Sequence, residues 1–189
     1  MFVLIRASLL ALAMAAVSTG TLAVDLSGNP ITQLAPAGAR ATVLFFAASD
    51  CPISNRYIPE MQRLAKQYEP LGVRVWFVYP NPGDDAQAIR AHNMEFAITA
   101  NTALDTRQNL MLLAHATVTP EVAVLVPERG SLHLVYRGRI DDRYLALGTE
   151  RPQATHHDLE EAIRAVLAGE PVPPPGGPPI GCSIVARKP

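Results

Sequence analysis

Two cysteines, Cys51 and Cys182, are the residues of this 189-residue chain with the most distinctive chemistry. Cys51 lies between an apolar, β-branched and aromatic run, residues 41–48, and a segment from about residue 52 with helical spacing of apolar residues. A thiol at a helix N-terminus is favoured as the thiolate, because free N–H groups and the helix dipole stabilise negative charge. Cys51 is therefore predicted to be reactive; the alternative is a small buried core thiol.

The position that would supply a neighbouring second thiol carries Ser54, so the motif is Cys-x-x-Ser. Cys51 can attack and form a mixed disulfide, but no adjacent thiol is present to resolve it. The other cysteine, Cys182, lies in a proline-rich tail, residues 170–189, which is predicted to be extended. At about 3 Å per residue, this tail is long enough to cross a domain and return to Cys51.

Three relationships between Cys51 and Cys182 stay open at this point. Cys182 can be a resolving thiol, or the two thiols never meet. They can also form a permanent disulfide, which would close a loop of about 130 residues and stabilise by about 5 kcal/mol. The small and apolar residues around Cys182, namely Ile180, Gly181 and Ile184, are typical of a docking segment and favour the first.

Residues 1–23 are predicted to be a secretory signal peptide, with Arg6 before an apolar core and small residues before the cleavage site. The chain is expected to be exported, to the periplasm or beyond, with no stable membrane anchor after cleavage, because the apolar core is short. An oxidising compartment suits a pair of cysteines. Loss of Arg6 changes the formal net charge from −1 to −2, and no basic patch indicates nucleic acid.

Apolar strands alternate with amphipathic helices along the rest of the chain. The predicted strands are residues 31–34, 41–48, 73–79, 102–104, 122–126 and 132–136, and the predicted helices are 52–68, 84–96, 107–114 and 155–167. Asp84 and Asp85 are expected to cap the second helix and Thr155 the last, which ends at Gly169. Residues 137–151 are expected to be irregular. This order predicts an α/β sandwich with a mixed sheet.

That order of elements resembles the thioredoxin-like fold, a three-layer sandwich of a mixed β-sheet flanked by helices. Residues 45–54 are similar to the active-site segment of exported thioredoxin-like proteins. Asp-Leu-Ser-Gly at residues 25–28 resembles the lead-in of the redoxin group, the alkyl hydroperoxide reductase/thiol-specific antioxidant relatives. Val-Thr-Pro at residues 118–120 resembles the cis-proline loop that faces the active cysteine. The resemblance implies a thioredoxin-like domain at residues 24–169, followed by the tail at 170–189.

The resemblance implies a thiol-dependent oxidoreductase or antioxidant that uses Cys51. Its substrate would be a thiol/disulfide protein or a small peroxide, and an unidentified electron donor would regenerate it. Peroxiredoxins carry Thr or Ser three residues before their peroxidatic cysteine, where this chain has Ala48, so a hydroxyl donor to peroxide is absent from its expected place. The catalytic residues are therefore predicted to be Cys51 and Cys182, with the substrate-binding residues Thr119, Pro120, Pro52, Ser54 and Arg139.

Two of these substrate-side assignments have a stated physical reason. If the bond before Pro120 is cis, the backbone of Thr119 can pair with an incoming chain next to Cys51. An arginine near Cys51 would lower the pKa of its thiol, and Arg139 is the candidate. Asp50, next to Cys51, would act in the opposite direction.

No metal or cofactor is expected, but a copper-binding carrier or assembly factor on the same fold is the rival class. Sco-type copper proteins use this fold with two cysteines and a histidine. Here the best histidine is His115, which would complete a site with Cys51 and Cys182. Sco-type cysteines lie close together in sequence, a spacing that Ser54 breaks. The third reading is a catalytically silent binding module.

Overall fold

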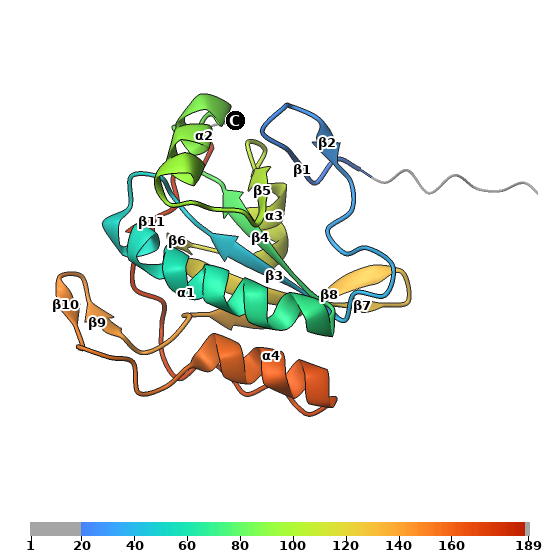
Figure 1. The fold of residues 1–189 in the computed structure, drawn as a ribbon, viewed down its shortest axis with the longest axis vertical. Helices are drawn as coiled ribbons and strands as arrows, with labels where there is room; N and C mark the ends of the chain where they lie inside the picture. Colours follow the sequence, from blue (N-terminus) through green and yellow to red (C-terminus); the bar gives the residue numbers. More distant parts are fainter. Residues whose placement is uncertain (1–19, 188–189) are drawn as a thin grey trace, which may run out of the picture.

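The computed structural model describes residues 20–187, and its elements are drawn in Figure 1. A seven-stranded sheet has the order β2-β1-β5-β4-β3-β7-β8. Its strands are β1 (Ala23–Val24), β2 (Pro30–Ile31), β3 (Ala41–Phe46), β4 (Val73–Tyr79), β5 (Asn101–Leu104), β7 (Glu121–Glu128) and β8 (Ser131–Gly138). Outside it, β6 (Val118–Thr119) pairs with β11 (Cys182–Ser183), and β9 (Tyr144–Ala146) pairs with β10 (Thr149–Glu150).

The helices of the described residues are α1 (Pro52–Tyr68), α2 (Ala86–Glu95), α3 (Asn109–Ala114) and α4 (Asp158–Ala168), with a 3-10 turn, η1 (Glu69–Leu71). None of these helices has the length and apolar character needed to cross a membrane. The predicted signal peptide lies mostly outside the described residues. Ala23, at its expected end, belongs to β1 and pairs with Ile31.

Strand β3 is central because all six of its residues are apolar or small enough to be buried. It runs parallel to β4 and antiparallel to β7. Val43 and Phe45 pack in the cluster that includes α1 and α4, whereas Leu44 and Phe46 pack in the cluster that includes α3. This alternation is the two-residue period of a strand that is covered on both faces.

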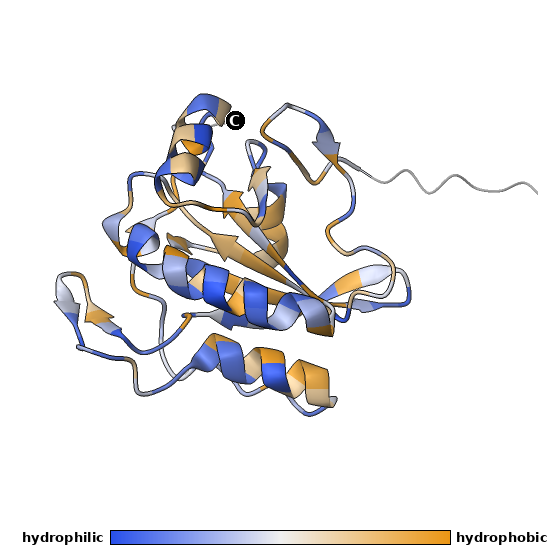
Figure 2. Ribbon diagram, in the orientation of Figure 1, coloured by the Kyte–Doolittle hydropathy of each residue, from blue (hydrophilic) through white to orange (hydrophobic). Residues whose placement is uncertain are grey.

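Three layers result, with α1, α2 and α4 on one face of the sheet and α3 on the other. Figure 2 shows apolar residues concentrated in the central strands, whereas hydrophilic and apolar residues alternate along α1. The predicted three-layer α/β sandwich with a mixed sheet is confirmed.

The helix ends test the capping predictions. Asp85 caps α2 and accepts bonds from the backbone N–H groups of Gln87 and Ala88, and Gly169 ends α4 in the left-handed conformation, both as predicted. The cap predicted at Thr155 is wrong, because α4 begins only at Asp158. Thr155 instead donates from its N–H and its hydroxyl to the buried carboxylate of Asp142. Tertiary demand for donors around a buried carboxylate overrides the local capping pattern.

The segment predicted to be irregular, residues 137–151, contains the β9–β10 hairpin. An ion pair of Arg56 with Glu150 at 2.5 Å attaches the hairpin to α1, and Arg143 pairs with Glu150 at 3.3 Å across the hairpin itself. The ring of Tyr144 lies 5.7 Å from that of Tyr57 in α1. The contacts of Arg56 and Tyr57 join the hairpin to residues far away in sequence, so the local pattern contains no sign of them.

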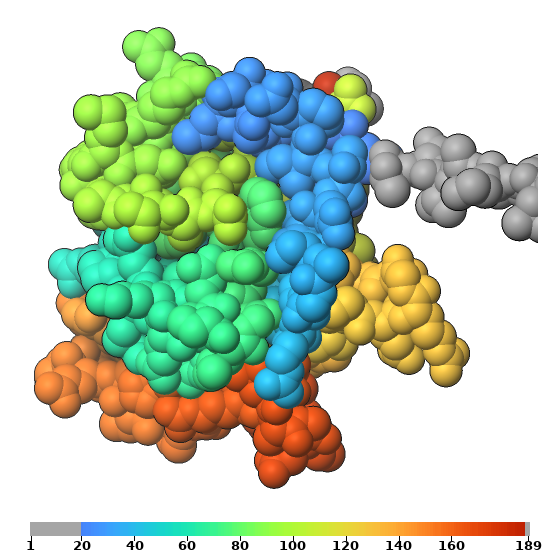
Figure 3. All heavy atoms as spheres, turned by 45° about the vertical axis from the view of Figure 1, so that its right-hand side comes forward, coloured from blue at the N-terminus to red at the C-terminus, as the bar shows by residue number. Residues whose placement is uncertain are grey.

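The proline-rich tail follows α4, includes β11 and continues towards α2, where the C-terminus is marked in Figure 1. At the other end of the chain, residues 20–40, in blue, lie along the side of the molecule next to the green residues of β4 and α2 (Figure 3). The extended character predicted for the tail is confirmed, but its short strand, β11, was not anticipated.

Candidate active site

Cys51 is the N-cap residue of α1, in an extended backbone conformation with φ of −91° and ψ of 110°. Pro52 begins the helix, where its missing N–H costs nothing. The Cys51 carbonyl accepts the first helical bond, from the N–H of Asn55 at 3.0 Å. Only 1% of Cys51 is exposed. The thiol therefore lies at the N-terminal end of α1, where the sequence pattern placed it, but it is covered.

The loop that faces Cys51 contains the Thr119–Pro120 peptide bond, which is cis as the resemblance implied. Thr119 is fully buried, and its carbonyl oxygen accepts a bond from the Cys51 thiol at 3.2 Å. Glu121 was not singled out from the sequence. Its buried carboxylate accepts bonds from the N–H groups of Thr117 at 2.7 Å and Val118 at 3.3 Å. Glu121 thus holds the strand that ends at Thr119 in place.

Cys182 lies directly opposite Thr119 in the antiparallel pair of β11 with β6. Its Sγ is 2.8 Å from the Sγ of Cys51, and both cysteines are free thiols. A disulfide bond is about 2.05 Å long, so a small movement of either sulfur would bring the two atoms to bonding distance. The structure therefore brings together the two predicted catalytic residues, which are 131 positions apart in sequence.

The surroundings of Cys182 disfavour its thiolate. Desolvation raises the pKa of Cys182 to about 11, and the hydrogen bond and the negative charge of Cys51 add to the effect. Cys182 is therefore a neutral thiol near pH 7 in this dithiol form. When Cys51 is bonded to a substrate sulfur, its charge is lost, and one reason for the raised pKa of Cys182 is removed.

Gly181 makes the close approach of the tail possible. A Cβ on this residue would lie 2.2 Å from the carbonyl oxygen of Thr119 and 2.6 Å from its carbonyl carbon. Both atoms belong to backbone that cannot move aside without disturbing the loop before Pro120. Only glycine at position 181, therefore, lets the tail pack against Thr119 in this register.

Arg139 holds the tail further upstream. Its Nε donates to Asp158 at 2.9 Å, and Asp158 also accepts a bond from the N–H of Gly176 at 2.6 Å. A Cβ on Gly176 or Gly177 would lie within 3 Å of the Arg139 guanidinium. The backbone carbonyl of Arg139 also accepts a bond from the Tyr136 hydroxyl at 2.7 Å. The influence predicted for Arg139 on the Cys51 thiol stays a prediction.

Ser54 supports the loop before the helix. It is buried, and its Oγ accepts a bond from the N–H of Ala48 at 3.3 Å. Ser49 donates its hydroxyl to Asp84 at 2.5 Å. Asp84 is therefore not a second cap for α2, as was expected, but a buried carboxylate that fixes the loop. Burial raises its pKa.

A buried polar chain continues from this loop. The Asn55 side-chain amide donates to the Ser49 carbonyl at 3.1 Å, and its oxygen lies 2.9 Å from His92 Nε2. Tyr79 OH lies 3.0 Å from His92 Nδ1. Because the Asn55 oxygen can only accept, His92 carries its proton on Nε2 and accepts from Tyr79. Burial lowers the pKa of His92, which favours this neutral form.

The copper alternative can be compared with the positions of its residues. His115 is exposed and ends α3 in the left-handed conformation, with its carbonyl accepting a bond from Arg137. Within the described part of the chain, no group of three or more His, Cys, Asp and Glu side chains is arranged to hold a metal ion. This geometry gives no support to a site of Cys51, Cys182 and His115.

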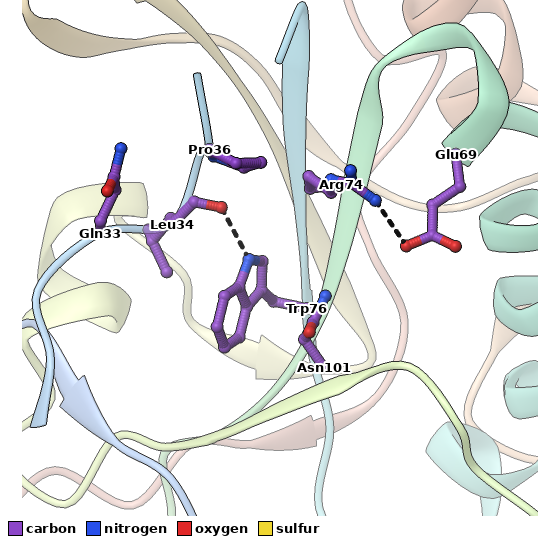
Figure 4. Close-up of a pocket in the computed structure, with 7 residues that line it drawn as sticks. All are labelled: Gln33, Leu34, Pro36, Glu69, Arg74, Trp76 and Asn101. Carbon is purple, nitrogen blue, oxygen red and sulfur yellow. Dashed lines mark hydrogen bonds and ion pairs between the residues drawn. The ribbon is translucent and has the colours of Figure 1, made fainter. Parts of the chain in front are cut away.

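Two surface pockets differ in their relation to the thiols. One, of about 290 Å³, is lined by Pro52, Ile53, Arg56, Tyr144, Gly148 and Glu150, and so adjoins Cys51. The other, of about 300 Å³, is lined by residues that include Arg74 and Trp76, whose indole N–H donates to the Leu34 carbonyl at 2.9 Å (Figure 4). Arg74 lies near the start of β4, whereas Cys51 follows the end of the parallel β3. The pocket of Figure 4 is thus remote from the thiols.

Comparison with known proteins agrees with this arrangement. The AhpC/TSA family profile matches residues 16–142. No curated protein matches significantly. An uncharacterized conserved protein from Geobacillus kaustophilus is 26% identical, with coverage of 89% of this chain and 90% of that chain and a TM-score of 0.71. A hypothetical protein from Sinorhizobium meliloti 1021 is 24% identical, with coverage of 90% and 95% and the same TM-score.

A secreted Mycobacterium tuberculosis disulfide oxidoreductase, described as homologous to E. coli DsbE, has the same fold. It is 18% identical, with coverage of 79% of this chain and 96% of that chain and a TM-score of 0.51. The thioredoxin-like fold inferred from the order of elements is therefore confirmed.

Proposed function

Because the chain belongs to the AhpC/TSA family, whose profile matches more than half of its length, we propose that it is a thiol–disulfide oxidoreductase. Cys51 attacks a substrate disulfide, and Cys182 resolves the product. The single observation that carries this proposal is the 2.8 Å separation of the two sulfurs across the β6–β11 pair.

The first step is attack by the Cys51 thiolate on one sulfur of a substrate disulfide. A bond forms between Cys51 and that sulfur, the substrate S–S bond breaks, and the other substrate sulfur leaves as a thiolate. In the second step Cys182 loses its proton to solvent and attacks Cys51 Sγ. The remaining substrate thiolate leaves, and the Cys51–Cys182 disulfide remains. The substrate disulfide gains two electrons from the enzyme. An external dithiol protein then reduces the Cys51–Cys182 disulfide with two electrons of its own and becomes a disulfide itself.

A disulfide substrate is favoured over a peroxide by the surroundings of Cys51. Ala48, three residues before Cys51, has no hydroxyl to donate to a peroxide. The backbone of Thr119 is an open edge for an extended chain whenever the tail leaves it. Reaction with peroxide would convert Cys51 to a sulfenic acid, which Cys182 would condense to the same disulfide with loss of water.

The test uses the aromatic disulfide 5,5′-dithiobis(2-nitrobenzoate) and mass spectrometry. The wild-type protein should release two equivalents of coloured thiol and end with a Cys51–Cys182 disulfide. Cys182→Ser should release one equivalent and retain a mixed disulfide at Cys51, and Ser183→Ala, an exposed neighbour, should behave as wild type. The proposal fails if the wild type forms no internal disulfide, or if Cys182→Ser also releases two equivalents. A parallel reaction with hydrogen peroxide measures the peroxide alternative.

Export belongs to the same proposal. It is supported by the signal-like pattern of residues 1–23 and by the two cysteines, which suit an oxidising compartment. N-terminal sequencing of the protein from an expressing cell's exported fraction tests it. Full-length protein retained in the cytosol would contradict it.

A further inference from the structure

The tail occupies the edge that a substrate chain would use. Strand β11 pairs with β6, and Ile184 extends the pairing by donating its N–H to the Thr117 carbonyl at 3.0 Å. With the tail in this position Cys51 is only 1% exposed. The reduced protein is thus closed, because the same backbone that would align a substrate holds the tail that carries Cys182.

Two side chains outside this strand pair hold the tail beyond Cys182. Asn81 accepts a bond from the N–H of Val185 at 3.0 Å. Gln108 donates to the Val185 carbonyl at 2.7 Å and accepts from the N–H of Arg187 at 2.9 Å. Val185 therefore has both of its backbone polar groups bonded to side chains, as a residue in a strand would have them bonded to a neighbouring strand.

Gln108 is arranged for this contact. It is 5% exposed, and a second bond from its amide nitrogen, to the Pro80 carbonyl at 3.1 Å, fixes the orientation of the amide group. Its backbone has a φ of 60°, a conformation that non-glycine residues adopt infrequently. Every one of these side-chain bonds goes to backbone, so Gln108 and Asn81 recognise the position of the tail rather than its side chains.

The position matters because side chains alternate along an extended segment. A slip of one residue would turn Cys182 away from Cys51 and bring a residue with a Cβ towards the Thr119 carbonyl. The bonds to Val185 and Arg187 oppose such a slip.

We propose that Gln108, assisted by Asn81, is a positioning residue that locks the reduced tail in the register that presents Cys182 to Cys51. Release of this lock opens Cys51 to substrate. The inference rests on the proposed function. It has a specific consequence, because attack by Cys51 needs the tail to leave, whereas resolution by Cys182 needs it to return. The lock therefore slows the first step and speeds the second.

The test measures both steps with 5,5′-dithiobis(2-nitrobenzoate) in stopped flow. Release of the first equivalent of coloured thiol reports attack by Cys51, and release of the second reports resolution by Cys182. The Cys51→Ser variant measures the direct reaction of Cys182 with the reagent, which is subtracted. Gln108→Leu removes both bonds to the tail, whereas Gln108→Glu keeps an acceptor for Arg187 and loses the donor to Val185. Both variants should speed attack and slow resolution, each by about tenfold in Gln108→Leu. Gln108→Glu should change them at least as much, because a carboxylate oxygen would then face the carbonyls of Val185 and Pro80.

Two further variants keep the result interpretable. Gln153→Leu replaces an exposed glutamine elsewhere on the surface and should change neither step. Asn81→Ala removes the second side chain of the lock and should act in the same direction as Gln108→Leu, which covers the case that the leucine variant fails to fold. Iodoacetamide labelling of Cys51 in the Cys182→Ser background is an independent measure of how often the tail uncovers Cys51. The labelling rate should increase in the Gln108 and Asn81 variants.

The inference is overturned if the folded variants slow both steps in proportion, as a general loss of structure would, or change neither. Opposite changes in the two steps support it. Its failure is separable from that of the proposed function. If the wild-type protein does not release two equivalents of coloured thiol, the proposed function is contradicted. A wild-type protein that releases both, with variants that match it, contradicts only the role of Gln108.

Discussion

Replacement of Gly181 by alanine tests the geometry of tail docking with a single methyl group. The new Cβ would lie 2.2 Å from the carbonyl oxygen of Thr119 and 3.0 Å from Cδ of Pro120. Gly181 is not among the glycines with a positive φ, so alanine fits its local backbone. Any effect must therefore come from the contact with the loop before Pro120, which carries the Cys51 hydrogen bond.

The expected size follows from that contact. An overpacked methyl group costs about 1–3 kcal/mol in a packed environment. Here the docked tail bears the cost, while the undocked tail does not. The effective concentration of Cys182 at Cys51 should therefore fall about 10- to 100-fold, since about 1.4 kcal/mol corresponds to a factor of ten. The Cys51–Cys182 disulfide then becomes easier to reduce, and its reduction potential rises by about 30–60 mV.

The assay is equilibration of the protein with mixtures of oxidised and reduced dithiothreitol, followed by acid quenching and mass spectrometry of alkylated protein. Ser183→Ala is the matched control, because it changes an exposed neighbour in the same strand, β11. Its potential should equal that of the wild type. A Gly181→Ala potential within about 10 mV of wild type, well below a tenfold effect of about 30 mV, would refute the docking geometry.

Three further predictions concern the support of the site. Burial raises the pKa of Asp105 to about 6, so its neutral form stabilises the fold at low pH, and this contribution is lost as pH rises through about 6. In urea unfolding, the stability of wild type relative to Asp105→Asn should fall by about 3 kcal/mol between pH 3 and 7; parallel pH profiles would contradict this. Arg139→Ala leaves the buried Asp158 carboxylate without its cation and should destabilise by about 3 kcal/mol in urea unfolding, with faster alkylation of Cys182; unchanged values for both would count against the tail contact. Glu121→Ala removes the acceptor for two N–H groups before Thr119 and should cost about 2 kcal/mol or more, with faster amide exchange in that loop; Glu121→Gln, which keeps an acceptor, should lose less, and equal losses would argue against this role.

The local part of this protein could be predicted from the sequence. The buried β3 and the helix α1 are specified by runs of neighbouring residues, and together they fix Cys51 at the start of a helix. Such patterns work because the period of a strand or helix depends on residues a few positions apart. The cis bond before Pro120 was anticipated in a different way, from a resemblance, since proline alone leaves the trans form in the majority.

The polar interior could not be predicted in the same way. Thr155 was expected to cap a helix and Asp84 to cap another, yet each bonds to a group that is distant in sequence. His92 and Asn55 join the loop before Cys51 in a chain that no spacing reveals. A buried polar group takes whichever partner the fold brings near, so its role depends on tertiary contacts.

The same division applies to the two thiols. The sequence by itself determined that Cys51 has no local partner, because Ser54 stands where a second thiol would be, and that the other cysteine lies in an extended tail. Only the tertiary structure decided that the tail docks at Thr119 with Cys182 at 2.8 Å from Cys51. The reason is physical. Docking depends on a glycine that lets two backbones meet and on side chains, such as Gln108, that bond to the tail backbone across a sequence separation of 77 residues or more.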